Sequence, residues 1–564
     1  MTETIRKSLR ESPKARWLAM FVVSMAMFGA YYFSYAESSI KPILESSIGW
    51  TSKDIGVYTS AYAWFNVGLF MLILSGIVLD KLGIRKTGLV ATALMVIGTA
   101  INYWAMISLS PDAMSTVPLY GPIKTQVLYS SIGFAVFGTG SEAAGITVVK
   151  AIVKWFKGKE LALALGLQLS IARLGTALTL AVSLPLAIKF TYKTPILMSF
   201  ALMLVGLGAF IIYMVLDKRL DASEKNIVVK EEDSFRLRDI LLVIKNKAFW
   251  YTAILCVLFY SAIFPFLIYA PDFMINKYHV APKLAGLIPM LLPIGTIFLT
   301  PLFGSIYDKK GKGATIMIIG SVLLIIVHGF LAIPALNNWV FAAILVVFLG
   351  IAFSLVPSAM WASVPKFIPE KQLGTAYAVI FYVQNIGLLA IPLILGIILN
   401  SSNPNVSPNK AIIRSSIEQS FHRVLADNNI KISKNKLTVA IDKTTESVVD
   451  SIVQTTTYIP TPQKEVNIEN IKSNIIDSNL SLSGRLSLNS NSKIAIKELK
   501  KSFEDATFTI VKNAKLDIRY NYENDILIFV VLGFLSVIFS FLLKAEDKKK
   551  GYGLEKPNIQ KTAE

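Results

Sequence analysis

The chain has little of the chemistry that disulfides, metal centres and most active sites require. It contains a single cysteine, Cys256, which excludes a disulfide within the chain and a thiolate cluster for a metal. Its three histidines, His279, His328 and His422, stand far apart and lack the spacing of metal ligands. No arrangement of a nucleophile and base and no phosphate-binding loop is present either. The sequence therefore predicts neither an enzyme nor a bound cofactor.

Charged residues are also scarce for a chain of this length. Only 16% of the 564 residues are charged and 54% are hydrophobic, with long uncharged runs throughout, which predicts a polytopic helical membrane protein. The first run begins at Trp17 after a basic segment and continues past Tyr35, so we expect a membrane span rather than a signal peptide. Most of the Lys and Arg residues behind the net charge of +19 fall in short loops. That distribution indicates a lipid bilayer as partner and argues against nucleic acid.

The apolar runs predict an all-α fold with twelve membrane spans in two halves of six. The expected spans are 17–37, 56–79, 87–108, 126–149, 160–189 and 195–216, then 248–270, 284–306, 314–335, 339–362, 374–399 and 526–544. The expected domains are an N-terminal half (1–216), a cytoplasmic connector (217–247), helices 7 to 11 (248–400), an extracytoplasmic insertion (401–525), helix 12 (526–544) and a cytoplasmic tail (545–564). An even number of spans places both termini on one side, and the basic loops mark that side as cytoplasmic.

A short motif recurs after the second and the eighth expected spans. The chain reads GIVLDKLGIRK after the first of these and GSIYDKKGKG after the other, with matching residues 228 positions apart. The matched residues are Gly76 with Gly304, Asp80 with Asp308, and Gly83 with Gly311. The repeat resembles the signature of major facilitator transporters, whose two six-helix halves are related in this way.

The motif residues suggest structural and gating roles rather than substrate contact. Gly76 and Gly304 are expected to permit close approach of neighbouring helices. Asp80 and Asp308 can accept hydrogen bonds from the N-terminus of a neighbouring helix. With Arg85, we expect them to make contacts at the cytoplasmic face that break and reform as the two halves rock.

Residues 401–525 break the pattern of membrane spans. Apolar runs shorten there, and Asn, Ser and Lys become abundant. Helical apolar faces at 410–426, 438–454 and 494–511 predict a small, mainly helical domain. Span parity places it outside the cytoplasm, where it could bind a protein partner or act as a lid.

Glu142 and Arg173 are charges inside stretches apolar enough to cross a bilayer. At the helical rise, Glu142 is about 12 Å from Lys150 at the cytoplasmic end, and Arg173 is about 21 Å from Lys159, near mid-membrane. Charges at such depth usually face a cavity or a partner. An acid and a base on consecutive helices could bind the amine and the carboxylate of one zwitterion. A structural ion pair between the two residues remains the alternative.

Several segments resemble the lysosomal dipeptide transporter branch of the major facilitator superfamily. They are GTGSEAAG, WFKGKELALALGLQLSIARLG from Trp155, QLGTAYAVIFYVQNIGL, YAWFNV at 62–67 and FPF at 264–266. The resemblance covers roughly residues 17–400 and the final helix, but not 401–525. It implies a small-peptide transporter in which Glu142 holds the substrate amine, Arg173 holds the carboxylate, and Trp361 lines the cavity.

Other polar and aromatic residues of the spans are candidates for the same cavity. An amide inside a bilayer needs a partner, and a peptide bond is a natural one. The remaining candidate binding residues are Tyr62, Asn66, Tyr260, Gln384 and Asn385. Packing between helices is the alternative role for each of them.

The sequence thus predicts a transporter of small peptides, chiefly dipeptides, that works by alternating access. One alternative keeps the fold but carries an organic anion or an amino acid on Arg173 alone. Another is a non-transporting receptor or scaffold that uses residues 401–525. The Lys-, Asn- and Ile-rich composition favours a bacterial inner membrane, with a lysosome or other endomembrane as the alternative. Uniport and proton coupling both remain open.

Overall fold

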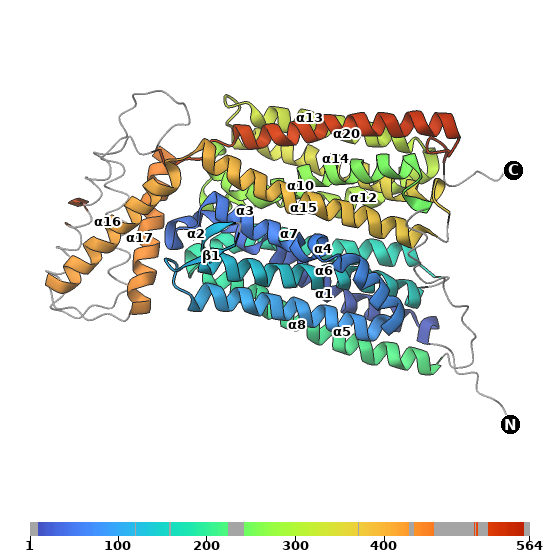
Figure 1. Cartoon of the computed structure of the whole chain (residues 1–564), viewed down its shortest axis with the longest axis horizontal. Helices are drawn as coiled ribbons and strands as arrows, with labels where there is room; N and C mark the ends of the chain where they lie inside the picture. Colours follow the sequence, from blue (N-terminus) through green and yellow to red (C-terminus); the bar gives the residue numbers. More distant parts are fainter. Residues whose placement is uncertain are drawn as a thin grey trace.

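Long helices lying side by side form two groups in the structure, a computed structural model (Figure 1). The structure describes residues 9–118, 120–156, 159–223, 242–369, 372–427, 434–455, 501, 504–505 and 517–557. We call the end of the bundle at which α1 begins and α20 ends the terminal face. The opposite end, from which α16 and α17 project, is called the insertion face (Figure 1).

The N-terminal half is built from five long helices and several short elements. The long helices are α1 (Pro13–Ser39), α5 (Met71–Ser108), α6 (Thr125–Phe156), α7 (Leu161–Lys189) and α8 (Lys193–Ser223). The short elements are η1 (Leu9–Glu11), α2 (Lys41–Ile48), α3 (Ser52–Ser60), η2 (Ala61–Ala63) and α4 (Trp64–Gly68). An antiparallel hairpin of β1 (Met114–Val117) and β2 (Gly121–Lys124), which the sequence did not predict, joins α5 to α6.

The C-terminal half and the insertion are also helical. The half contains α10 (Lys247–Tyr278), α11 (Pro282–Ala285), α12 (Leu291–Lys310), α13 (Gly313–Ala332), α14 (Trp339–Ser363), η3 (Val364–Lys366), α15 (Leu373–Ser402) and α20 (Glu523–Lys550). The insertion contributes α16 (Val406–Asp427) and α17 (Lys434–Thr455), which match two of its three expected helices. Most of the third, 494–511, lies outside the described residues, as does most of the connector at 217–247.

Eleven of the described helices are long and apolar enough to cross a membrane. The one expected span that has no separate helix among the eleven, 56–79, ends within α5, where Gly83 has the non-helical angles φ 75° and ψ 171°. Thr87 donates a hydrogen bond to the carbonyl of Val78 at 3.3 Å, although nine residues of straight helix would separate them by about 13.5 Å. The chain therefore turns at Gly83, ending the span that α3 begins and starting the next. The all-helical membrane fold is confirmed.

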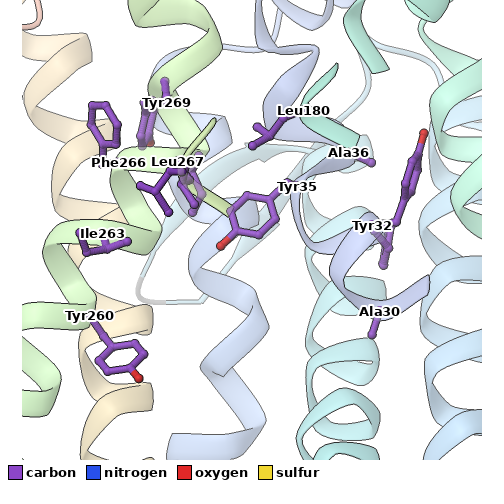
Figure 2. Packing of buried hydrophobic residues seen from close by; sticks show 14 of the residues in the cluster. Ala30, Tyr32, Tyr35, Ala36, Leu180, Tyr260, Ile263, Phe266, Leu267 and Tyr269 are labelled. Atoms are coloured by element: carbon purple, nitrogen blue, oxygen red, sulfur yellow. The ribbon is translucent and has the colours of Figure 1, made fainter. Parts of the chain in front are cut away.

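The two halves pack closely near the insertion face. A Cβ added at Gly56 of α3 would lie 2.9 Å from the Cα of Gly396 in α15, so both positions require glycine. The N-terminus of α3 is fixed by a capping box between Thr51 and Asp54. Figure 2 shows Tyr35 of α1 pointing toward side chains of α10, whereas Tyr32 points the other way. The core is thus continuous across the boundary between the halves.

The expected close helix approach at the first motif glycines is wrong for this conformation. Among the described residues, a Cβ added at Gly76 or Gly304 would meet no heavy atom within 4 Å, and the same holds for Gly374 at the start of α15. These three glycines lie toward the terminal face, opposite the packed pair Gly56 and Gly396. The halves are therefore in contact near the insertion face, and nothing in the described part of the chain packs against these three glycines toward the terminal face.

Candidate functional site

Glu142 lies on α6 at the boundary between the two halves. The hydroxyl of Tyr62, in η2, donates to Glu142 Oε1 at 3.1 Å and to Ser141 Oγ at 3.3 Å. Asn385 of α15, from the opposite half, also interacts with the Glu142 carboxylate. The acid therefore contacts both halves of the protein.

Two amides bridge the halves beside this acid. Asn66 Nδ2 donates to Asn385 Oδ1 at 3.4 Å and to the carbonyl of Tyr62 at 3.4 Å. Asn385 Nδ2 donates to the carbonyl of Phe381 at 3.0 Å. Asn66 is fully buried, and its Oδ1 has no hydrogen-bond donor among the described residues. The pair therefore retains one acceptor atom, Asn66 Oδ1, for a further hydrogen-bond donor.

Arg173 of α7 is surrounded by aromatic rings. Its guanidinium carbon lies 5.6 Å from the ring of Tyr31 in α1, 5.6 Å from Phe264 in α10 and 4.8 Å from Phe353 in α14. Its exposed fraction is 8%. No described acid lies within ion-pair distance of it, so the rings supply its electrostatic stabilisation through cation–π contacts.

Glu142 and Arg173 do not pair with each other in this conformation. The hydrogen bond of Glu142 comes from Tyr62, and the contacts of Arg173 are aromatic. The structural ion pair that the sequence left open is therefore not formed here. Each charge instead faces residues of the opposite half, Asn385 in one case and Phe264 and Phe353 in the other.

Trp361 and Tyr260 form one wall beside these groups. Trp361 Nε1 donates to the Tyr260 hydroxyl at 2.9 Å, and its ring stacks on Phe381 at 4.9 Å. The Tyr260 ring contacts Phe353 at 5.6 Å, which links the wall to the rings around Arg173. The structure thus brings together Trp361, Tyr260 and the surroundings of Arg173.

Gln384 belongs to the packing of the C-terminal half. Its Oε1 accepts a hydrogen bond from Cys256 Sγ at 3.5 Å, and its exposed fraction is 7%. It is one residue before Asn385 on α15, so it points to a different side of that helix. Its contacts indicate packing between helices, which is the role that the sequence left open as the alternative to substrate binding.

The rings around Arg173 are the part of the site that sequence reasoning missed. Tyr31 and Phe353 were not among the candidates, and Phe264 was noted only within the FPF segment. Aromatic residues are common in membrane helices, so none of them stands out singly. Only the folded arrangement shows that three helices direct rings at one cation.

The motif residues organise the terminal face within each half. In the first half, Asp80 pairs with Lys150 at 2.8 Å, and Arg85 pairs with Asp221 at 2.8 Å. Lys154 also binds Asp221, at 2.6 Å, so α5, α6 and α8 are tied together.

In the second half, Gly311 has φ 71° and lies against the C-terminal tail. A Cβ there would be 2.5 Å from the carbonyl oxygen of Glu555. The same carbonyl accepts a hydrogen bond from the backbone N–H of Lys312 at 3.0 Å. Asp308, on the last turn of α12, acts electrostatically on Lys366. In both halves, motif residues therefore lie beside other parts of the terminal face.

Comparisons with known proteins agree with this architecture. A sequence model described as Major Facilitator Superfamily matches residues 17–392. The lysosomal dipeptide transporter MFSD1 of Danio rerio is 27% identical over 395 residues, covering 68% of this chain and 81% of the relative. The protein of the same name from Homo sapiens is 27% identical over 401 residues, covering 68% and 80%.

Solved structures show the same fold at low sequence identity. A bacterial homolog to the human lysosomal transporter Spinster, in an inward-facing and occupied conformation, aligns with a TM-score of 0.54 and 11% identity over 95% of this chain and 98% of that one. The nucleoside transporter NupG aligns with a TM-score of 0.51 and 15% identity over 68% and 91%.

Proposed function

Because the chain belongs to the Major Facilitator Superfamily, we propose that it carries small peptides, dipeptides above all, across a membrane by alternating access. The observation that carries the proposal is Arg173, a buried cation at the boundary between the halves whose neighbours are aromatic rings. A substrate carboxylate would give this guanidinium the bidentate partner that no described acid provides. The relatives named as dipeptide transporters support peptides as the substrate class.

The other site residues have complementary roles in this proposal. Glu142 binds the substrate ammonium group, with the Tyr62 hydroxyl fixing the orientation of the carboxylate. Asn66 and Asn385 lie where a peptide bond could exchange hydrogen bonds with them. Trp361 and Tyr260 form an apolar wall that tolerates different side chains. Binding energy from both termini of the peptide would then explain a broad substrate range.

A second candidate substrate is an organic anion bound by Arg173 alone. The observation in its favour is that Tyr62 already donates a hydrogen bond to Glu142, whereas Arg173 lacks a described acidic partner. The test is thermal stabilisation of the purified protein by a dipeptide, its N-acetylated form and its C-terminal amide. We expect the unmodified dipeptide to stabilise the protein and each blocked form to lose most of the effect. Full stabilisation by the N-acetylated form would favour the anion instead.

We also propose that the terminal face is cytoplasmic, in a bacterial inner membrane or an endomembrane. Basic residues gather at that face, including Lys150, Lys154, Lys309 and Lys310, as the positive-inside rule predicts for the cytoplasmic side. Labelling of a Lys310→Cys variant in intact cells with a membrane-impermeant thiol reagent tests this orientation. We expect no labelling until the membrane is permeabilised.

A further inference from the structure

Buried charges at the insertion face join three parts of the chain. Lys41 of α2, in the N-terminal half, binds Asp272 of α10, in the C-terminal half, at 2.7 Å. Lys41 also binds Glu45 at 3.0 Å. The second Glu45 oxygen binds Lys410 of α16, in the insertion, at 2.7 Å. The exposed fractions of Lys41, Glu45, Asp272 and Lys410 are 0%, 3%, 1% and 4%. We call these four residues the buried charge cluster.

Aromatic residues from the end of the insertion cover the cluster. The Tyr520 hydroxyl donates to Glu45 Oε1 at 2.7 Å, and its ring lies 4.0 Å from Lys41 Nζ and 4.8 Å from Lys410 Nζ. Tyr522 donates to Asp272. Both tyrosines are buried. The insertion therefore contacts the cluster from both of its ends, through α16 and through the segment that leads into α20.

The charges balance only when the insertion is counted. The two halves supply two carboxylates, Glu45 and Asp272, and one ammonium group, Lys41. Lys410 supplies the second ammonium group and makes the cluster neutral. A buried ion whose partner is removed is strongly unfavourable, because nothing replaces its lost hydration. Asp525 is the next acid near Lys41, but it forms no ion pair with a described residue.

The insertion also holds each half by separate contacts. On the N-terminal side, Lys410 binds Glu45, and Arg414 donates to the carbonyl of Ser46 at 3.2 Å. On the C-terminal side, the backbone N–H of Tyr520 donates to Asn276 Oδ1 at 3.0 Å. Separating the halves at this face would therefore require breaking Lys41–Asp272 and one of the two sets of insertion contacts.

We propose that Lys410 is a gate residue of the transporter, supplied by the insertion, and that it holds the insertion face closed. By neutralising Glu45, it stabilises the conformation in which the halves meet at this face. The insertion thereby sets the balance between the two conformations of the cycle. The inference rests on alternating access as proposed above, but not on the identity of the substrate.

Distances between spin labels on the two halves test this role directly. Labels at Lys53→Cys in α3 and Lys283→Cys in α11 report the separation at the insertion face, since both lysines are exposed. Cys256, the only native cysteine, is buried. With Lys410 intact, we expect one short distance. Lys410→Met should raise the ratio of a longer-distance population to the short one by roughly tenfold or more.

Matched variants distinguish an effect of charge balance on the distances from a general loss of folding or packing. Arg423→Met removes an exposed cation of the same helix and should leave the distances unchanged. Adding Glu45→Gln to Lys410→Met restores neutrality and should restore the short distance. Tyr520→Phe, which keeps the ring and removes one hydrogen bond to Glu45, should give a smaller shift if Lys410→Met does not fold.

Two results would overturn the proposal. One is an unchanged distance distribution in Lys410→Met, or in Tyr520→Phe if that variant has to replace it. The other is a shift that Glu45→Gln fails to reverse, because that would point to packing rather than charge balance. The distances are read without substrate, so a protein that fails to transport dipeptides would still give an answer. Failure of the gate and failure of the proposed substrate are therefore distinguishable.

Discussion

At the residue scale, Arg173 is the buried charge on which the proposed binding site depends most. It lies among aromatic rings from both halves, with no described acid beside it. Its depth in an apolar helix was evident from the sequence, and so was that of Glu142. The rings around it were not, because Tyr31, Phe264 and Phe353 are far apart in the chain and unremarkable singly.

Arg173→Lys should weaken dipeptide binding although it keeps the charge. A lysine cannot bind a carboxylate through two parallel hydrogen bonds, and it stacks less well on aromatic rings. We expect affinity to fall by about 10- to 100-fold, measured by titration calorimetry. Lys189→Arg on the same helix, an exposed position, is the matched control. Unchanged affinity in Arg173→Lys would mean that the guanidinium fork does not bind the substrate.

Tyr62→Phe should change stability and dipeptide binding through its effect on Glu142. The substitution removes the hydroxyl that donates to Glu142 Oε1 and leaves the Phe134 and Phe137 ring contacts in place. Losing a hydrogen bond to a buried charged group costs about 1.5–3 kcal/mol. We expect lower thermal stability without peptide and weaker binding of dipeptides that have a free amine. Equal loss for N-acetylated dipeptides would argue against a role in amine binding.

At the scale of elements, hydrophobic runs predicted where the helices lie in the sequence. They did not predict which helices contact one another. Each expected span in the described residues has a helix, because a bilayer requires long apolar segments. The expected close approach at Gly76 and Gly304 failed, since a motif glycine reveals where contact can form and not in which conformation it forms. The pairing of Lys410 with Glu45, and of Lys41 with Asp272, depends on residues hundreds of positions apart, which no local pattern indicates.

Gly83→Ala should destabilise the protein, whereas Gly76→Ala should not. Gly83 has φ 75°, in the left-handed region that residues with a Cβ avoid, while a Cβ at Gly76 meets no atom of the described residues within 4 Å. We expect a loss of about 1–2 kcal/mol at Gly83, seen as a lower melting temperature in detergent. Equal melting temperatures for the two variants would contradict a chain reversal at Gly83.

At the scale of the whole molecule, two helical halves are joined at the insertion face, whereas no described residue packs against the glycines near the terminal face. The fold class and the division into halves followed from the sequence repeat. The contacts that join the halves at the insertion face did not, because one sequence must support both conformations of a transporter. No sequence pattern predicted that Lys410 of the insertion takes part in closing the insertion face.

Glu45 should contribute no pH dependence to closure of the insertion face between about pH 5 and 8. Burial raises the pKa of Glu45, but the Lys41 and Lys410 ammonium groups outweigh it, so that pKa lies below its ordinary value of 4.5. A lowered acid pKa means that the interaction is complete above the ordinary value and is lost only as the pH falls through the lowered one. In an Asp525→Asn background, which removes the other acid near Lys41, the label distances at Lys53→Cys and Lys283→Cys should therefore stay constant across this range. Opening at pH 5 would contradict the charge assignment.

Uptake of a labelled dipeptide into proteoliposomes tests the central claim most directly. The unmodified protein is compared with Glu142→Gln, Arg173→Ala and the surface control Lys189→Ala, each reconstituted to the same density. The account predicts saturable uptake by the unmodified protein and the control, and a loss of at least about tenfold in each site variant. Unimpaired uptake in both Glu142→Gln and Arg173→Ala would contradict it.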